Sequence, residues 1–279
     1  MAILVEDTEA LLSTCTGNIP LILSSPHGGY SGILGIDGKR QSFTAATPGC
    51  GFNNKTDTQT KELTQRVVET MASQGIVPYA VISDIVRADL DLNRTRAENV
   101  YKSEVSNTAR VRALQLYDAY YDRLWQHIEM IKGVFDPENI NKVLLLDIHG
   151  AEFAKGDLDL TTTSPKGLSS SQINIVYPNE SHSITLWDAL SKEGFEFRNI
   201  AGQSHEKRPS CNLIEAFGIH NDNGINAVQI EFNRPLRNRG EYQKTADRFA
   251  KALIAFAHAT YSTASQDLEE WAALFLSVS

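Results

Sequence analysis

Cysteine is scarce in this sequence, and long apolar runs are missing from it. The 279 residues include only 3 cysteines, Cys15, Cys50 and Cys211, at wide and irregular spacings. Such spacings match neither a disulfide framework nor a paired C-x-x-C zinc site, so we expect reduced thiols. No run approaches the roughly 18 apolar residues of a membrane span, and residues 1–7 lack the basic start and apolar core of a signal peptide. We therefore expect a soluble, cytoplasmic protein that does not bind membranes.

Positive charge is also in short supply. The sequence has 26 lysines and arginines against 34 aspartates and glutamates, a formal net charge of −8. Because a nucleic-acid-binding surface needs a basic stripe that displaces counterions, this balance argues against nucleic acid as a partner. The 42% hydrophobic content excludes general disorder. A chain of this length can bury a substantial core, and we expect a single domain over residues 1–279. The sequence does not indicate the oligomeric state.

Apolar periodicity predicts alternating strands and helices. Short apolar runs bounded by turn residues predict strands, and apolar residues at three- and four-residue intervals predict helices. The predicted strands are 19–25, 77–85, 143–148, 173–177 and 227–232, and the predicted helices are 56–74, 106–134, 183–192, 242–259 and 268–276, with a surface loop at 161–171. This alternation predicts a single three-layer α/β/α domain with a mixed central sheet.

Two histidines directly follow predicted strands. His27 comes after the strand 19–25, His149 comes after the strand 143–148, and each precedes a glycine. In open α/β sheets, ligands bind beyond the carboxyl ends of the strands. A catalytic zinc ion takes about three nitrogen or oxygen ligands from the protein and keeps one position for water. The pair therefore favours a metal site over two histidines that only hydrogen-bond their loops.

The third metal ligand should be a carboxylate, and two candidates remain open. Asp57 at the start of a predicted helix is the first candidate, although aspartate at such a position often only caps the helix. Glu152 competes through its H-x-x-E spacing from His149. We expect Asp147 on the opposite face of its strand, where it would support a ligand and not bind the metal.

Several charged residues near the strand ends have both a structural and a catalytic interpretation. Glu231 lies inside an apolar run, where a carboxylate is costly unless it is paired or functional. It either forms a salt bridge to Arg234 or another arginine, or it is the general base that takes a proton from metal-activated water. Arg87, Asn93 and Arg94 are either a solvated charge cluster or a fork that binds a substrate carboxylate.

Five motifs resemble those of the N-formylglutamate amidohydrolase (deformylase) family, which is itself similar to the zinc carboxypeptidases. They occur in the family's order between residues 20 and 240, and they are Pro26-His27-Gly28, Asp57, Arg87 with Asp91-Leu92-Asn93-Arg94, Asp147-Ile148-His149 and Glu231-Phe232-Asn233-Arg234. The resemblance implies a phosphorylase/hydrolase-like α/β/α fold of the zinc-carboxypeptidase type, with one zinc ion per chain.

The resemblance also implies roles for individual residues. It makes His27, Asp57 and His149 the metal ligands, Glu231 the general base, and Arg87, Asn93 and Arg94 the group that binds carboxylate and polarises the carbonyl. Two departures from the family concern specificity. Gly150 stands where the family has a serine, and residues 205–212 replace a glycine-rich stretch that shapes the pocket, so Asn212 belongs to the expected substrate site.

The leading functional hypothesis is a zinc-dependent amidohydrolase that removes a formyl or other acyl group from an acidic amino acid such as N-formyl-L-glutamate. The near alternative is a metallocarboxypeptidase, or an amidase acting on peptides or on acyl or γ-glutamyl amides. A non-catalytic protein that binds acidic metabolites would keep the fold without turnover. A cysteine hydrolase would use Cys211 with His205 or His220, but no nucleophile-elbow pattern surrounds the thiol.

The distribution of arginine supports a small anionic substrate. In an acidic chain, seven arginines fall in or near the segments expected to converge, and they are Arg87, Arg94, Arg96, Arg208, Arg234, Arg237 and Arg239. A cationic cleft within an acidic surface attracts small anions.

Overall fold

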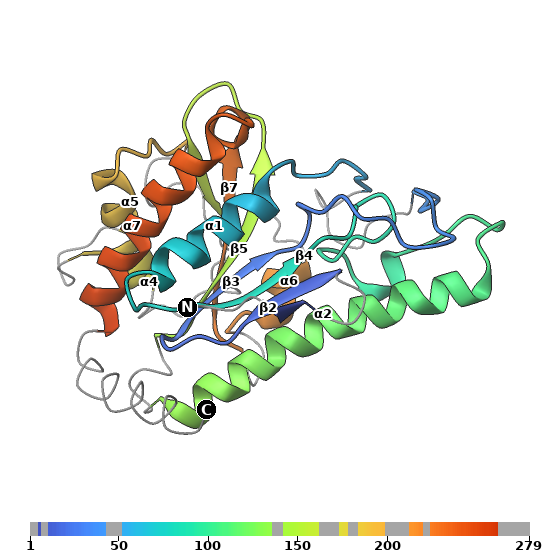
Figure 1. Cartoon of the computed structure of the whole chain (residues 1–279), viewed down its shortest axis with the longest axis horizontal. Coiled ribbons are helices and arrows are strands. Elements are labelled where there is room, and N and C mark those ends of the chain that lie inside the picture. Colours follow the sequence, from blue (N-terminus) through green and yellow to red (C-terminus); the bar gives the residue numbers. More distant parts are fainter. Residues whose placement is uncertain are drawn as a thin grey trace.

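The computed structural model describes residues 5–6, 11–42, 52–135, 142–161, 173–177, 184–198, 212–219 and 224–261, and the strands in these ranges form one sheet (Figure 1). The strands are β1 (Val5–Glu6), β2 (Leu12–Cys15), β3 (Leu21–Ser25), β4 (Tyr79–Ser83), β5 (Leu144–Ala151), β6 (Leu158–Thr161) and β7 (Asn226–Asn233). They lie in the order β1-β2-β4-β3-β5-β7-β6. The central strands β4, β3, β5 and β7 are parallel, whereas the pairs β1–β2, β2–β4 and β6–β7 are antiparallel. The sheet is therefore mixed, as expected.

Helices cover both faces of this sheet. The described α-helices are α1 (Thr60–Ala72), α2 (Asn107–Val134), α4 (Ile173–Val176), α5 (Leu186–Lys192), α6 (Asn212–Phe217) and α7 (Tyr242–Tyr261), and the 3-10 helices are η1 (Arg96–Glu98) and η2 (Arg234–Arg237). One core lies between the sheet and α1, α5 and α7, and a second lies between the opposite face and α2 and α6. Figure 1 shows α1 and α7 on one side of the strands and the long α2 on the other. This is the expected three-layer α/β/α architecture.

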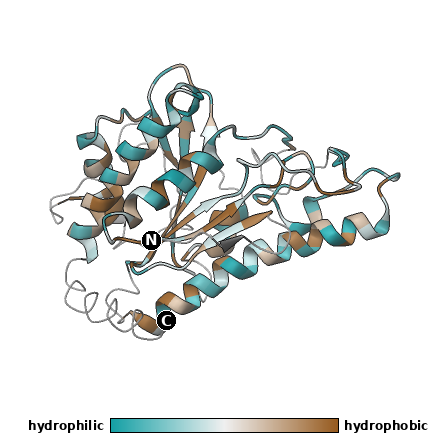
Figure 2. Ribbon diagram, in the orientation of Figure 1, coloured by the Kyte–Doolittle hydropathy of each residue, from teal (hydrophilic) through white to brown (hydrophobic). Residues whose placement is uncertain are grey.

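The central strand β5 shows why its sequence is apolar at nearly every position. Leu144, Leu146 and Ile148 pack into the core beneath α1 and α7, while Leu145 packs into the core beneath α2. Successive side chains of a strand point to opposite faces, so a strand covered on both sides needs apolar residues throughout. The covering helices, by contrast, alternate between hydrophilic and hydrophobic residues (Figure 2), as amphipathic helices do.

Most predicted elements are confirmed, and the exceptions have local causes. The predicted strand 173–177 is wrong, because residues Ile173–Val176 form the short helix α4. Ile175 and Val176 pack into the core with α5 and α7, and none of the described strands pairs with them. Apolar runs this short satisfy both strand and helix periodicity. Periodicity also does not predict β2 and β6, which are only four residues long.

Two predicted segments lie wholly or mostly outside the described residues. These are the helix 268–276 and the loop 161–171, of which only Thr161 at the end of β6 is described. None of the helices in the described ranges combines the length and the apolar content that a membrane crossing requires.

Candidate metal centre and active site

The candidate site lies where three neighbouring parallel strands end. His27 follows β3, His149 lies near the end of β5, and Glu231 lies in β7, paired in register with His149. Parallel strands that are neighbours present their carboxyl ends at the same edge of a sheet. Residues in register on adjacent strands also share a face, so His149 and Glu231 point to the same side, the side of α2 and α6.

Two glycines after His27 allow its loop to pack closely against neighbouring backbone. A side chain at Gly28 would collide with the backbone nitrogen of Lys61 in α1, and one at Gly29 would collide with the backbone of Asp84 beyond β4. This packing brings the loop against the start of α1, where the Asp57 N–H donates to the His27 carbonyl at 3.0 Å. The H-G-G motif therefore serves a close backbone approach that also places Asp57 next to His27.

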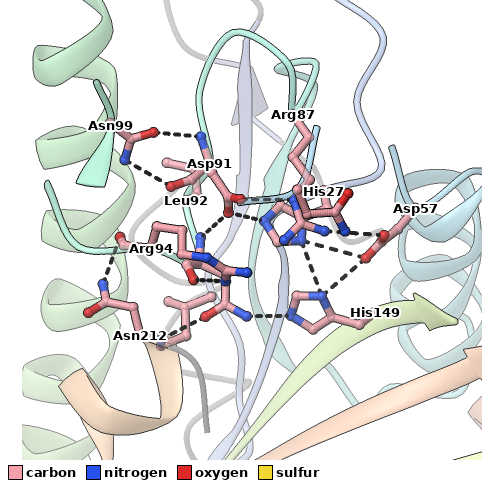
Figure 3. Close-up of polar contacts among 12 residues, drawn as sticks. His27, Asp57, Arg87, Asp91, Leu92, Arg94, Asn99, His149 and Asn212 are labelled. Atoms are coloured by element: carbon pink, nitrogen blue, oxygen red, sulfur yellow. Dashed lines mark hydrogen bonds and ion pairs between the residues drawn. The ribbon is translucent and has the colours of Figure 1, made fainter. Parts of the chain in front are cut away.

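The side chains of His27, Asp57 and His149 face one another in a triangle (Figure 3). The Nδ1 atoms of the two histidines are 3.2 Å apart, and Asp57 Oδ2 lies 3.1 Å from His149 Nδ1 and 3.5 Å from His27 Nδ1. All three residues are buried. Ligand atoms of a tetrahedral zinc ion, each about 2.0–2.1 Å from the metal, lie about 3.3 Å from one another. The triangle therefore has the dimensions of three corners of such a site.

Each imidazole of the triangle is oriented from behind by a buried aspartate. His27 Nε2 lies 2.7 Å from Asp91 Oδ1, and His149 Nε2 lies 2.7 Å from Asp147 Oδ2. Because an ionised carboxylate only accepts hydrogen bonds, each neutral ring carries its proton on Nε2 and presents a lone pair at Nδ1. Two such lone pairs beside the Asp57 carboxylate repel one another unless a cation lies between them. The donor set therefore fits a metal ion, and carboxylates behind histidine ligands are typical of zinc sites.

The position of Asp147 corrects one expectation from the sequence. The prediction that it lies on the opposite face of β5 from His149 is wrong, because residues two apart in a strand share a face. Asp147 contacts His149 directly, and its Oδ1 accepts a hydrogen bond from Ser24 Oγ in β3 at 2.6 Å. This second contact holds the carboxylate in place, so Asp147 supports His149, as expected, from the same face of the strand.

The electrostatics of the triangle favour a cation. Burial opposes a charge on His149, but the carboxylates of Asp147 and Asp57 outweigh it and raise the pKa of His149 to about 10. Burial also opposes the charge of Asp57, whose pKa is nevertheless lowered by hydrogen bonds with His149 and His27. The same negative charge that favours a proton here would favour a metal ion in its place, and metal binding would release the proton.

Glu231 is half-buried, and one of its carboxylate oxygens makes no hydrogen bond with the described residues. Gln229 Nε2 donates to Glu231 Oε1 at 2.6 Å, whereas Oε2 is buried and has no hydrogen-bond partner among the described residues. Burial raises the pKa of Glu231, and Asp57 raises it further, against the opposing effect of His149. An open carboxylate with a raised pKa is suited to accept a proton.

The alternative interpretations of Glu231 and Glu152 find no support in this geometry. Arg234 pairs with Glu152, its Nη1 lying 3.4 Å from Oε2, and no arginine among the described residues forms a salt bridge with Glu231. The Glu152 side chain is 73% exposed, whereas that of Asp57 is 8% exposed and contacts both histidines. The structure therefore brings Asp57, and not Glu152, to the histidine pair.

Asp91 joins His27 to two buried arginines. Its Oδ2 accepts a hydrogen bond from Arg87 Nε at 2.9 Å and lies 3.2 Å from Arg40 Nη1. Burial opposes the charge of Asp91, but Arg87, His27 and Arg40 hold its pKa well below the usual range. Arg87 Nη1 also lies 3.7 Å from Asp57 Oδ1. Arg40 could not be predicted from the sequence, because it belongs to no motif and follows no predicted strand.

Asn93 lies next to His149, and Arg94 contacts Asn93. Asn93 Nδ2 is 3.3 Å from His149 Nε2, and Asn93 Oδ1 accepts the N–H of Leu213 at the start of α6. Arg94 is buried, and its Nη1 donates to the Asn93 carbonyl at 2.7 Å. Asn93 is therefore adjacent to the histidine pair and Arg94 to Asn93, and the contacts of both residues with a substrate stay predictions.

Asn212, the first residue of α6, lies beside the backbone of Arg94 (Figure 3). Its Nδ2 donates to the Arg94 carbonyl at 3.0 Å and to the Tyr117 hydroxyl of α2 at 2.9 Å. It also contacts the Tyr121 hydroxyl. Asn212 thus ties α6 to α2 and to the backbone beside the site, and its predicted substrate contact stays a prediction.

The residues of the cysteine-hydrolase alternative, Cys211, His205 and His220, lie outside the described residues. Of the three cysteines, the structure describes Cys15, which is free and buried in β2. Burial raises the pKa of its thiol to about 11. A buried, protonated thiol is a poor nucleophile at neutral pH.

Comparison with known proteins identifies the fold. No protein-family model and no curated protein matches the sequence. The structure is similar to N-formylglutamate amidohydrolase from Ralstonia eutropha, with a TM-score of 0.59 and 15% identity over 89% of this chain and 98% of the other. A gene product of Agrobacterium tumefaciens gives 0.51 and 15% over the same shares, and an N-acetylmuramyl-L-alanine amidase from Mycobacterium smegmatis gives 0.45 and 11% over 87% and 98%. The first two similarities confirm the expected fold class, and the chain has the α/β/α fold of the N-formylglutamate amidohydrolase structure.

Proposed function

We propose that this protein is a zinc-dependent amidohydrolase that hydrolyses the amide bond of an N-acyl acidic amino acid such as N-formyl-L-glutamate. The observation that carries the proposal is the buried triangle of His27, Asp57 and His149 with the open oxygen of Glu231 on the same side of the sheet. Structural zinc sites take four protein ligands, whereas catalytic sites take three and leave one position for water. Three converging donors among the described residues suit a catalytic ion.

In this proposal, His27 Nδ1, His149 Nδ1 and Asp57 would hold one zinc ion. When bound, zinc supplies a Lewis acid and lowers the pKa of water to roughly 7. Asp91 and Asp147 keep both imidazoles turned with Nδ1 toward Asp57, where the ion would bind. The Gly150 N–H donates to Asp57 Oδ2 at 3.2 Å and so restrains the third ligand.

Glu231 is the general base in this proposal. Its open Oε2 accepts a proton from the attacking water, and the water oxygen forms a bond to the carbonyl carbon. Glu231 then gives the proton to the nitrogen as the carbon–nitrogen bond breaks, so that a carboxylic acid and a free amino acid leave. The raised pKa of Glu231 suits both transfers, because a base works best when its pKa lies close to the working pH.

Arg87 and Arg94 are the cations proposed to act on the substrate. Arg87 lies beside Asp57, from where it polarises the scissile carbonyl and stabilises the negative charge that develops on its oxygen. Arg94 binds a substrate carboxylate, with Asn93 beside it. A guanidinium is suited to this because its planar fork matches the two carboxylate oxygens.

The charge of the site supports a substrate with two carboxylates. The site region contains four carboxylates (Asp57, Asp91, Asp147 and Glu231) and four buried guanidiniums (Arg40, Arg87, Arg94 and Arg237), so their charges cancel when the histidines are neutral. A bound divalent ion then leaves a charge of +2 in a largely buried site. N-formyl-L-glutamate, with its two carboxylates, balances that charge.

The proposal is tested with purified, zinc-loaded protein. Hydrolysis is measured for N-formyl-L-glutamate, for N-formyl-L-glutamine with one carboxylate fewer, and for peptides with a free C-terminus. We expect about one zinc ion per chain by elemental analysis and the highest kcat/KM for the dicarboxylate. Release of amino acids from peptides alone would identify a carboxypeptidase instead. A metal-free protein that zinc does not activate would contradict the enzyme and favour a metabolite-binding protein.

A further inference from the structure

Arg237 is a buried arginine with no part in the proposed chemistry. It lies in η2, just after β7, and it is only 5% exposed. Burial lowers the pKa of its guanidinium, and the negative charges of Asp57 and Glu231 oppose that effect. Burial of a guanidinium is costly unless its N–H groups are hydrogen-bonded, so we expect the buried Arg237 side chain to have several acceptors.

The nitrogens of Arg237 donate to backbone carbonyls of three separate segments. Nε donates to Phe232 in β7 at 2.9 Å, Nη2 donates to Ala151 at the end of β5 at 3.1 Å, and Nη1 donates to Thr58 before α1. Each acceptor lies one or two residues from a proposed functional residue, which is Glu231, His149 or Asp57 respectively. One side chain therefore joins the backbones that carry the base and two metal ligands.

Gly150 provides the space that this guanidinium occupies. A Cβ atom at position 150 would lie 2.5 Å from Arg237 Nη1 and closer still to Cζ. Contacts this short do not occur, so any side chain at position 150 would displace the guanidinium from its three acceptors. This gives a physical reason for a glycine where the family that the sequence resembles has a serine.

The turn that carries Asp57 has a strained backbone. Gln59 has a φ of 66°, in the left-handed region that is uncommon for residues other than glycine. Such a conformation persists only where the surrounding contacts enforce it. Tyr30 Oη accepts the Gln59 N–H at 3.2 Å, the His27 carbonyl accepts the Asp57 N–H, and Arg237 binds the carbonyl between them. Of these contacts, that of Arg237 ties the turn to the ends of β5 and β7.

We propose that Arg237, admitted by Gly150, is a positioning residue that holds Asp57 in the orientation that binds the metal ion. It also holds the end of β5 and the Glu231 segment of β7 against this turn, so that ligand and base keep their separation. The inference rests on the proposed function in so far as Asp57 is a ligand and Glu231 a base. The contact between Gly150 and Arg237 is independent of that function.

The first test measures zinc affinity by competition with a chelator. We expect Arg237→Met to weaken zinc binding by about 10–100-fold, as loss of a supporting contact behind a ligand does. Arg237→Lys should recover part of the affinity, since an ammonium reaches some of the same carbonyls. Arg66→Met is the matched control, because Arg66 is half-exposed in α1 and pairs with Asp247 of α7.

The outcomes of this test separate the two proposals. Wild-type protein that binds no zinc would contradict the proposed function. Wild-type protein that binds zinc, together with Arg237→Met of equal affinity, would overturn the positioning role alone. In the zinc-saturated enzyme, Arg237→Met should lower kcat and leave KM nearly unchanged. A change confined to KM would make Arg237 a substrate-binding residue and would also overturn the inference.

The second test needs neither metal nor activity. Thermal unfolding of the metal-free protein is compared for wild type, Gly150→Ala, Arg237→Met and the double variant. Gly150→Ala should lower Tm by about 5 °C when Arg237 is present, because it overpacks the site. Gly150→Ala should lower Tm much less in the Arg237→Met background, because the methionine side chain at position 237 is flexible and uncharged. Equal losses in both backgrounds would show that the two positions are not coupled.

Discussion

Two buried histidines of this protein lie in opposite electrostatic environments. His149 in the site at the strand ends is 3% exposed, and His127 of α2 in the core is 5% exposed. The carboxylates of Asp147 and Asp57 raise the pKa of His149 to about 10 despite its burial. His127 packs on Tyr79, its Nε2 lies 3.2 Å from the Ala80 carbonyl, and burial lowers its pKa to about 4.

Burial alone does not make a histidine part of a cation site. His127 has a carbonyl beside one ring nitrogen, and its Nδ1 has no hydrogen-bond partner among the described residues, so it stays neutral and packs. His149 has carboxylates on both sides, and a second imidazole shares one of them. It is the surrounding negative charge that turns a buried imidazole into part of a cation site.

The largest expected effect is the loss of zinc on substitution of a site histidine, which substitution of the core histidine should not cause. His27→Ala and His149→Ala each remove one of three donors, so neither variant should retain zinc after gel filtration. His127→Gln is the matched control and should keep about one zinc ion per chain. Elemental analysis makes the measurement, and near wild-type zinc in both alanine variants would refute the ligand assignment.

The next effect concerns catalysis without loss of metal. Glu231→Gln should lower kcat at least about 100-fold, since a general base contributes roughly 10²–10⁴-fold. Zinc content should stay unchanged. Glu152→Gln makes the same chemical change at an exposed glutamate and should leave both quantities unaltered. If Glu231→Gln turned over at nearly the wild-type rate, Glu231 would be structural.

A smaller loss of zinc affinity is expected from substitution of the aspartates that contact the two site histidines. Asp91→Asn and Asp147→Asn remove the negative charge that orients each imidazole, so zinc affinity should fall by about 10–100-fold. Asp118→Asn, at a half-exposed aspartate paired with Arg96, serves as the control. Chelator competition measures all three variants. Unchanged affinity in Asp91→Asn and Asp147→Asn would mean that the ligands need no support.

The smallest effect tests the core histidine through pH. The pKa of His127 falls from 6.5 to about 4 on folding, so the unfolded chain binds more protons in this window and stability falls as the pH drops through it. Between pH 7 and pH 5 this costs about 2 kcal/mol, which His127→Gln should abolish. Urea unfolding of metal-free protein at both pH values measures the difference.

The site histidine should show the opposite sign in the same metal-free protein. Because folding raises the pKa of His149 to about 10, its stabilising effect is present below pH 6.5 and is lost as the pH rises toward 10. A wild-type protein and a His127→Gln variant with the same pH dependence between 7 and 5 would show that His127 is not held neutral by burial.

Much of the site could be inferred from the sequence because its parts follow predicted strands. The two histidines and Glu231 are marked by the strand ends and by a carboxylate in an apolar run, which are local features. The choice of Asp57 over Glu152 is not local, because both satisfy plausible spacings and only the packing of the His27 loop on α1 separates them. Arg40 gave no signal, because it reaches Asp91 from a loop outside every motif.

Most of the alternation of strands and helices, the mixed character of the sheet and the residue types at the strand ends could be read from the sequence, since these follow from side-chain periodicity and composition. The tertiary structure was needed to show which groups contact the two site histidines, that Asp147 shares a face with His149, and that Gly150 makes room for Arg237. The physical reason is distance along the chain. Contacts between Asp91 and His27, or between Arg237 and Thr58, exist only after the sheet has brought their segments together, and no local propensity encodes them.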